Sequence, residues 1–324
     1  MPFLLAVLLS FIPALCYAAI VYWLDRFEKE PLRLLCGAFA WGAVVATIGA
    51  IIATTVLQLG VGIITGSDAV AELAGTTVFA PIVEEVLKGL AVALIFLIFP
   101  HEFDSVLDGM VYGAITALGF AATENVLYLY FQGYQDGGYS SLIALFVLRV
   151  ILGGWGHAVY TAFTGIGFAA GRLRPGLGSR LLFPLLGLSA AIFLHGLHNI
   201  MATFLTANLG LVGLGATLLV DWLGWGVALA VMVWAILRER RWLVLYLREE
   251  VALGTISATQ YASACSLSGQ MSARIRGRHA RQFYATCAEL AQKKHQLAVV
   301  GEERGNTARV ASLRARLVQL APMA

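Results

Sequence analysis

Two adjacent glutamates and a lysine interrupt an apolar segment of the chain. In PIVEEVLKGL (residues 81–90), Glu84 and Glu85 precede Lys88. Glu84 and Lys88 are four residues apart and can pair on one face of a helix, whereas Glu85 is rotated from Glu84 by about 100°. One lysine neutralises one carboxylate, so the other is left to face a cavity. The pattern therefore favours a functional cluster over a structural ion pair.

Other apolar segments carry polar residues that are costly inside a membrane and usually face a protein interior. The candidates for chemistry are Glu124, His157, His195 and Asn199, with His198 as a supporting residue beside them. Asp108, Arg149 and Asp221 are better explained by structural roles, such as capping or pairing of helices.

These side chains suit hydrolysis. A carboxylate near histidines in a poorly hydrated pocket can take a proton from water near neutral pH. We assign that role to Glu84 or Glu85, with Lys88 fixing the other carboxylate. His195 and Asn199, one helical turn apart, can donate hydrogen bonds to a developing oxyanion.

Glu124 and His157 complete this hypothesis by orienting the water or protonating the leaving amine. The same kinds of side chain can instead bind a divalent metal such as zinc, with Glu85, His157 and His195 as ligands. Such an ion would lower the pKa of a bound water. The chain contains no HExxH motif, so its sequence leaves both chemistries open.

The composition indicates which elements must position these residues. The 324 residues are 59% hydrophobic and 13% charged, with a mean hydropathy of +0.80. A soluble domain would carry roughly twice that charged fraction. We therefore expect an all-α, polytopic membrane helix bundle. Seven segments are long enough to cross about 30 Å of hydrocarbon, near residues 3–24, 34–60, 76–99, 106–131, 142–170, 181–206 and 210–237.

The charges of the links predict the orientation. Basic residues occur after the first and fifth spans and at the start of the tail, whereas the links 61–75, 132–141 and 207–209 have none. The positive-inside rule then places the N-terminus outside and the C-terminus inside, although 100–105 is uninformative. At 1.5 Å per residue, the candidate carboxylates and imidazoles lie roughly 10–20 Å below the outer surface. They share one layer in the outer half of the bilayer.

The chain divides into a transmembrane domain (1–237) and a basic helical tail (238–324), which we expect in the cytoplasm. The tail has 14 Lys or Arg against 6 Asp or Glu. Its first segment, 238–250, is amphipathic and can lie on the inner leaflet. We expect residues 270–297 and 305–320 to pair as a helical hairpin without chemistry of its own. Nucleic-acid binding is not expected.

Four of these segments together resemble the PrsW family of intramembrane proteases, relatives of the CAAX prenyl protease and bacteriocin-processing superfamily. The resemblance covers roughly residues 15–205, and the order and spacing of its motifs make it specific. It rests on EEVLK (84–88), DGMVYGAITALGFAATENVLY (108–128), GHAVYTAFTGIGFAAGR (156–172) and HGLHN (195–199), with DRFEKEP (25–31) after the first span.

The resemblance assigns family positions to individual residues. The matching positions are the paired glutamates (Glu84 and Glu85), FxxxE (Glu124), the fifth-span histidine (His157) and HxxxN (His195 and Asn199). The wider superfamily has FxxxH where this chain has Glu124. The resemblance implies that residues 1–237 form a protease domain that cleaves peptide bonds in or beside the membrane.

The resemblance also implies partners and a location. Some family members act on membrane-anchored regulators such as anti-sigma factors, so we expect a membrane-anchored protein substrate, the lipid bilayer as surroundings and a bacterial plasma membrane. The family is often labelled metalloprotease, whereas superfamily relatives are argued to use a glutamate-activated water without metal. The alternative function is a proton-coupled transporter or channel that uses the same glutamates and histidines, or a non-catalytic scaffold. Transporters commonly contain repeated halves, and this sequence shows no internal repeat.

Overall fold

A computed structural model describes residues 1–27, 29–302 and 305–324, and every regular element within these ranges is a helix. The elements are α1 (Pro2–Leu24), α2 (Leu32–Ala40), η1 (Trp41–Ala46), α3 (Thr47–Thr65), α4 (Asp68–Ala74), η2 (Gly75–Phe79), α5 (Ala80–Ile98), η3 (Pro100–Glu102), α6 (Val106–Leu127), η4 (Tyr128–Gln135), α7 (Asp136–Leu145), η5 (Phe146–Leu152), α8 (Gly156–Arg172), α9 (Leu177–Leu209), α10 (Leu211–Tyr246), α11 (Arg248–Ala252), α12 (Ala258–Ala264), α13 (Leu267–Arg276), α14 (Arg278–Val300), α15 (Asn306–Leu320) and η6 (Ala321–Met323). The short elements η1, η2, η4 and η5 are π-helical.

The predicted all-α membrane class is confirmed. Five largely helical stretches of the described residues are long and apolar enough to cross a membrane: Pro2–Leu24, Leu32–Thr65, Val106–Arg172, Leu177–Leu209 and Leu211–Ala252. They contain six of the seven predicted spans. The remaining predicted span, 76–99, carries three charges in α5, which sets it apart from these apolar stretches. The count of seven spans and their orientation stay predictions.

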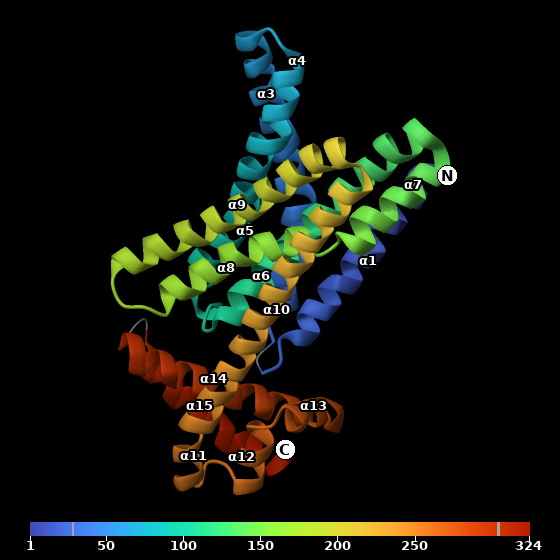
Figure 1. Cartoon of the computed structure of the whole chain (residues 1–324). Helices are drawn as coiled ribbons and strands as arrows, with labels where there is room; N and C mark the ends of the chain where they lie inside the picture. The colour runs from blue at the N-terminus through green and yellow to red at the C-terminus, as the bar shows by residue number, and fades with distance from the viewer. Residues whose placement is uncertain (28, 303–304) are drawn as a thin grey trace.

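The bundle has two distinct ends (Figure 1). The hairpin of α3 and α4 projects from one end, and the tail helices α11–α15 lie at the other. The link between α5 and α6 belongs to the tail end, because Asp104 in that link forms a buried ion pair with Lys293 of α14. The structure thus places the link that the loop charges could not assign.

Small residues bring α6 and α8 into close contact. A Cβ atom on Gly165 would lie 1.8 Å from the backbone oxygen of Gly109, and one on Gly113 would lie 2.5 Å from that of Thr161. No side chain larger than hydrogen fits at either glycine without moving a backbone. The close helix packing that the glycine-rich spans predict is therefore confirmed.

The predicted fifth span, 142–170, is not one helix. The chain turns at Gly138, whose φ is +68°, then runs through α7 and η5 to Leu152. Residues 153–155 interrupt the helix before α8 begins at Gly156. Glycines at 153, 154 and 156 explain the interruption, because each costs about 1 kcal/mol relative to alanine inside a helix. His157 consequently stands in the first turn of α8.

The tail packs onto an extension of the last membrane helix. Helix α10 continues past the predicted boundary at 237/238 to Tyr246. Leu243 and Leu247 are buried in the same core as α14 and α15, and the buried Trp242 stacks on His295 of α14. The expectation that 238–250 lies on the inner leaflet is therefore wrong, because its apolar face covers protein. Helices α14 and α15 pack together as predicted, although Gly277 separates α13 from α14.

Candidate functional site

Glu85 lies at the centre of a buried polar cluster formed by α5, α6, α8 and α9. One carboxylate oxygen lies 2.6 Å from Nζ of Lys88 and 3.0 Å from Nδ1 of His195. The other accepts a hydrogen bond from Oγ1 of Thr161 at 2.7 Å. Both Glu85 and Lys88 are completely buried. Because both oxygens of Glu85 have partners, this carboxylate is a fixed part of the protein scaffold.

Glu84 differs from its neighbour in having a carboxylate oxygen that accepts no hydrogen bond. Among the described residues, its buried Oε2 atom has no hydrogen-bond partner. The nearest charged or ionisable groups are Nζ of Lys88 at 3.7 Å and Nε2 of His195 at 3.8 Å. A buried carboxylate oxygen is costly when it accepts no hydrogen bond. This atom is therefore where a water molecule or a cation would be stabilised.

The tautomer of His195 follows from its partner. A carboxylate accepts hydrogen bonds, so the contact with Glu85 places the proton of the neutral imidazole on Nδ1 and leaves the lone pair on Nε2. That lone pair lies on the side of Glu84. Neutral His195 therefore cannot donate from Nε2 to an oxyanion, which argues against the role that we assigned from the sequence.

His157 joins the lysine to the carboxylate of α6. Its Nδ1 lies 3.3 Å from Nζ of Lys88, which can only donate, and its Nε2 lies 3.0 Å from Oε2 of Glu124. Arg149 binds the same Glu124 oxygen at 2.8 Å and also Oδ1 of Asn125 at 3.1 Å. Glu124 therefore has two cationic or hydrogen-bonding partners from the broken fifth span.

The remaining candidates of α9 point to other partners. Asn199 donates from Nδ2 to the backbone oxygen of Thr76 in η2, at 2.9 Å. His198 binds Asp221 of α10 through Nδ1, at 2.8 Å. Among the contacts of the described residues, neither side chain reaches Glu84 or Glu85. Asn199 thus joins α9 to the π-helical turn ahead of α5.

Sequence reasoning missed three contributors to the cluster. Thr161 and Tyr160 lie on α8, at four and three residues from His157, so helical spacing alone would have placed them on the same face. Arg149 was taken as structural, yet its contact with Glu124 joins it to the cluster. The ring of Tyr160 stacks on His195 with centroids 5.2 Å apart.

Three donors could hold a metal ion together. Within the described residues, ligand atoms of Glu84, His157 and His195 lie within 4.8 Å of one another. The sequence predicts Glu85 as the carboxylate ligand, but the glutamate in this set is Glu84. Glu85 is not available to a metal ion, because it is bound to Lys88, His195 and Thr161. The unpaired oxygen of Glu84 and the lone pair of His195 suit a cation. His157 would have to exchange its contact with Lys88 or Glu124 for the ion.

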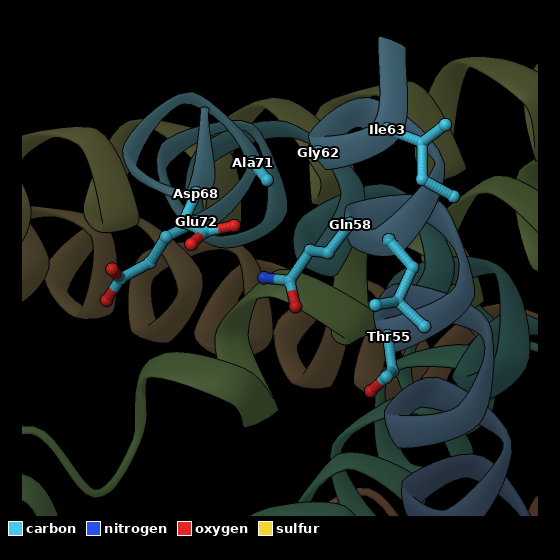
Figure 2. A pocket seen from close by; sticks show the side chains of 8 residues that line it. Thr55, Gln58, Gly62, Ile63, Asp68, Ala71 and Glu72 are labelled. Carbon is cyan, nitrogen blue, oxygen red and sulfur yellow. The ribbon is translucent and has the colours of Figure 1, made fainter. Parts of the chain in front are cut away.

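A separate groove of about 530 Å³ lies on the projecting hairpin of α3 and α4 (Figure 2). Gln58 of α3 and Asp68 and Glu72 of α4 contribute polar atoms to it. None of the predicted site residues lines this groove, so we place the chemistry in the Glu/His cluster.

Comparison with known proteins points in the same direction. The model of the PrsW family intramembrane metalloprotease matches residues 30–237. The chain is 28% identical over 188 residues to Protease PrsW of Geobacillus kaustophilus, which is 58% of this chain and 75% of that protein. It is 29% identical over 196 residues to Protease PrsW of Bacillus subtilis, covering 60% and 81% of the two chains. For Protease PrsW of Clostridioides difficile the identity is 25% over 196 residues, covering 59% and 76%. No solved structure matches the chain.

Proposed function

The chain belongs to the PrsW family of intramembrane proteases, and we propose that Glu84 activates the water that attacks its substrate. As a member of this family it is an intramembrane endopeptidase and a bacterial integral membrane protein. The family match does not favour the transporter alternative. The identity of the activating glutamate, the roles of the other residues, the metal and the substrate are the content of the proposal.

One observation carries the choice of Glu84 over Glu85. Oε2 of Glu84 is buried and unpaired and lies 3.8 Å from Nε2 of His195. A water between these two atoms would contact both the base and the imidazole. Glu85 has no oxygen left for a water, because Lys88, His195 and Thr161 occupy it.

The proposed reaction needs few movements of protein groups. Glu84 takes a proton from the water while the water oxygen bonds to the carbonyl carbon of the peptide. The carbonyl oxygen becomes an oxyanion as the tetrahedral intermediate forms. The proton on Glu84 then passes to the peptide nitrogen as the C–N bond breaks. Lys88 keeps the two adjacent carboxylates from repelling each other, since it lies between them.

The other residues of the cluster hold the side chains around Glu84 in place. Glu85 fixes His195 at Nδ1, and Arg149 and His157 hold Glu124. We propose that Asn199 acts by joining α9 to η2, with its second amide hydrogen left for substrate. Each of these is a positioning role, except where Asn199 meets the peptide.

As an alternative to direct activation of the water by Glu84, we propose that Glu84, His157 and His195 hold a zinc ion, in which case Glu84 is a ligand and not the base. Two histidines and one glutamate form a ligand set that zinc hydrolases use, with a fourth position open to water. The contact between Glu85 and Nδ1 of His195 is the kind of carboxylate partner that orients a metal-bound histidine. A bound ion would lower the pKa of the water and polarise the peptide carbonyl.

The substrate class follows from the site's surroundings. Glu124, His157 and His195 lie on stretches long and apolar enough to cross a membrane, so we propose that a substrate presents its peptide bond at that depth. We propose a membrane-anchored regulatory protein, of which an anti-sigma factor is one example. We propose that the basic tail lies in the cytoplasm, as the loop charges predict, and that it serves as a docking or regulatory part.

The proposal is tested by cleavage of a membrane-anchored reporter peptide by the purified chain in liposomes. Glu84→Gln should lower the cleavage rate by at least about 100-fold, because it removes the base. The matched control is Glu72→Gln, since Glu72 is an exposed glutamate on α4 outside the cluster. Wild-type cleavage by Glu84→Gln would overturn the assignment of Glu84.

A further inference from the structure

Asp221 is a buried carboxylate that lies outside the motifs of the site. It stands in α10 with only 7% of its surface exposed. A charge at this depth of an apolar helix is costly unless it has partners. Its partners are Nδ1 of His198, at 2.8 and 3.0 Å from the two carboxylate oxygens, and the hydroxyl of Tyr160 at 3.3 Å.

Tyr160 connects Asp221 to the two imidazoles of the cluster. Its ring lies parallel to His195, with a centroid separation of 5.2 Å and an interplanar angle of 22°. It also meets the edge of His157, with centroids 6.1 Å apart. The hydroxyl of Tyr160 is anchored by Asp221 at the far end of the ring. The plane of His195 is thus fixed by Glu85 at one nitrogen and by Tyr160 on one face.

His198 adds a second connection from α10 to the site. Its imidazole is bound to Asp221 through Nδ1, and its ring lies 6.2 Å from that of Tyr160. Since Asp221 accepts from Nδ1, the tautomer of neutral His198 is fixed with the lone pair on Nε2. Asp221 therefore holds two side chains of the site at once, from a helix that supplies none of the motif residues.

We propose that Asp221 is a positioning residue for hydrolysis, which acts by holding Tyr160 against His195 and by fixing His198. Helix α10 thereby forms a fifth wall of the active site. The inference rests on the proposed role of His195 beside Glu84. A displaced imidazole would misalign the water against the peptide carbonyl, and misplacement by about 1 Å can cost roughly 100-fold in rate.

The test compares kcat and KM of the full chain on the membrane-anchored reporter, with thermal unfolding measured in parallel. We expect Asp221→Ala to lower kcat by about 10- to 100-fold while KM changes by less than about 2-fold. Tyr160→Phe keeps the stacked ring and should lower kcat by about 3- to 10-fold. The double variant, Tyr160→Phe with Asp221→Ala, should have a kcat no lower than that of Asp221→Ala alone. Both substitutions remove the same hydrogen bond between Tyr160 and Asp221.

Asp221→Asn keeps a hydrogen-bond acceptor and should recover most of kcat. The matched control is Thr217→Val: Thr217 is also buried one turn earlier on α10, and its hydroxyl donates to the backbone oxygen of Gly213, its one hydrogen bond among the described residues. Its kcat should equal that of the wild type. Equal losses in Asp221→Ala and Asp221→Asn, in proportion to lost folded protein, would show a structural role and overturn the inference.

Wild-type kcat in Asp221→Ala, together with an inactive Glu84→Gln, would overturn this inference alone. Unchanged cleavage by Glu84→Gln would instead overturn the proposed mechanism on which it rests. The two failures are therefore distinguishable in one set of measurements.

Discussion

Nε2 of His195 and Oε2 of Glu84 face each other at 3.8 Å. The imidazole is fixed from behind by Glu85, and the carboxylate oxygen has no hydrogen-bond partner among the described residues. Two adjacent glutamates therefore have different surroundings, one closed by protein and one open to a small ligand. On the proposed mechanism, Glu85 therefore positions its neighbours and the adjacent Glu84 takes part in the reaction.

Replacing each of the two glutamates by glutamine should change the free energy of unfolding by different amounts. Glu85→Gln breaks the buried pair with Lys88 and should cost about 3 kcal/mol of unfolding free energy, because the buried ammonium loses its only partner charge within hydrogen-bond distance among the described residues. Glu84→Gln removes the charge of a carboxylate whose Oε2 accepts no hydrogen bond among the described residues. It should leave the free energy of unfolding within about 1 kcal/mol of the wild type. Both variants should be inactive. Unfolding in detergent measures the contrast, and equal destabilisation by the two substitutions would contradict it.

Metal content checks the zinc proposal without an activity assay. The purified wild-type chain should bind one zinc per molecule, whereas Glu84→Ala and His195→Ala should each bind at least about 10-fold more weakly, because each removes a ligand. The matched control, Glu72→Ala, should bind as the wild type does. A chain that cleaves its reporter in the presence of chelator, with no zinc bound, would instead support a water activated by glutamate alone.

Packing of α6 against α8 should not tolerate one added methyl group. Gly165→Ala places a Cβ against the backbone oxygen of Gly109, and the helices must separate, at a cost of about 1–3 kcal/mol. Gly224→Ala, in α10, has open space around it and should change stability by less than about 1 kcal/mol. Thermal unfolding of both variants gives the comparison. Equal stability of the two would argue against the close approach of the backbones.

The ion pair between Lys293 and Asp104 should hold the tail against the link between α5 and α6. Lys293→Met leaves Asp104 buried without its cation, so we expect a loss of about 3 kcal/mol in the stability of tail docking. Arg309→Met removes a half-exposed partner of Glu289 and should cost less than about 1 kcal/mol. Hydrogen exchange of α14 amides reports on docking. Similar protection in both variants would show that Lys293 does not hold the tail.

Packing of the tail should weaken in acid. Burial, together with the nearby Arg238, lowers the pKa of His295 to about 4, whereas an unfolded chain protonates histidine near 6.5. The unfolded state thus binds more protons between these values, so stability falls as the pH falls from about 6.5 to about 4.

The partial exposure of His295 limits this effect to roughly 1–2 kcal/mol, below the ~3 kcal/mol of the full shift. Hydrogen exchange of α14 across this pH range measures it. His295→Gln should flatten the dependence, since glutamine does not titrate. A dependence of the same size in this variant would assign it to other groups.

The sequence was sufficient to predict the helical class and the segments that carry the site. Loop charges and the helical rise placed Glu84, Glu124, His157 and His195 in one layer, and the structure brings them into one cluster. The sequence could not decide between Glu84 and Glu85. The 100° rotation between them shows that they face different directions on the helix, but it does not show which residues of other helices lie in each direction. The contact of Glu85 with Thr161 depends on how α8 meets α5.

Two other features depend on tertiary structure. In the sequence, the glycines at 153, 154 and 156 indicate tight helix packing, whereas in the structure they end one helix and start another beside His157. Composition does not distinguish these uses of glycine. Likewise, 238–250 has an amphipathic pattern that a membrane surface or a protein surface can satisfy, and the tail helices satisfy it. Asp221 was read as structural because its partners, Tyr160 and His198, lie far away along the chain.

The contact between Glu85 and His195 joins residues that are 110 positions apart in the chain. A ribosome must therefore synthesise and release α9 before the imidazole can meet its carboxylate, and α10 follows later still. The earlier helix α5 carries Glu84, Glu85 and Lys88, but the histidines of the cluster follow only with α8 and α9. On the proposed mechanism, a newly made chain therefore lacks an assembled site during insertion and gains activity only when its assembly is nearly finished.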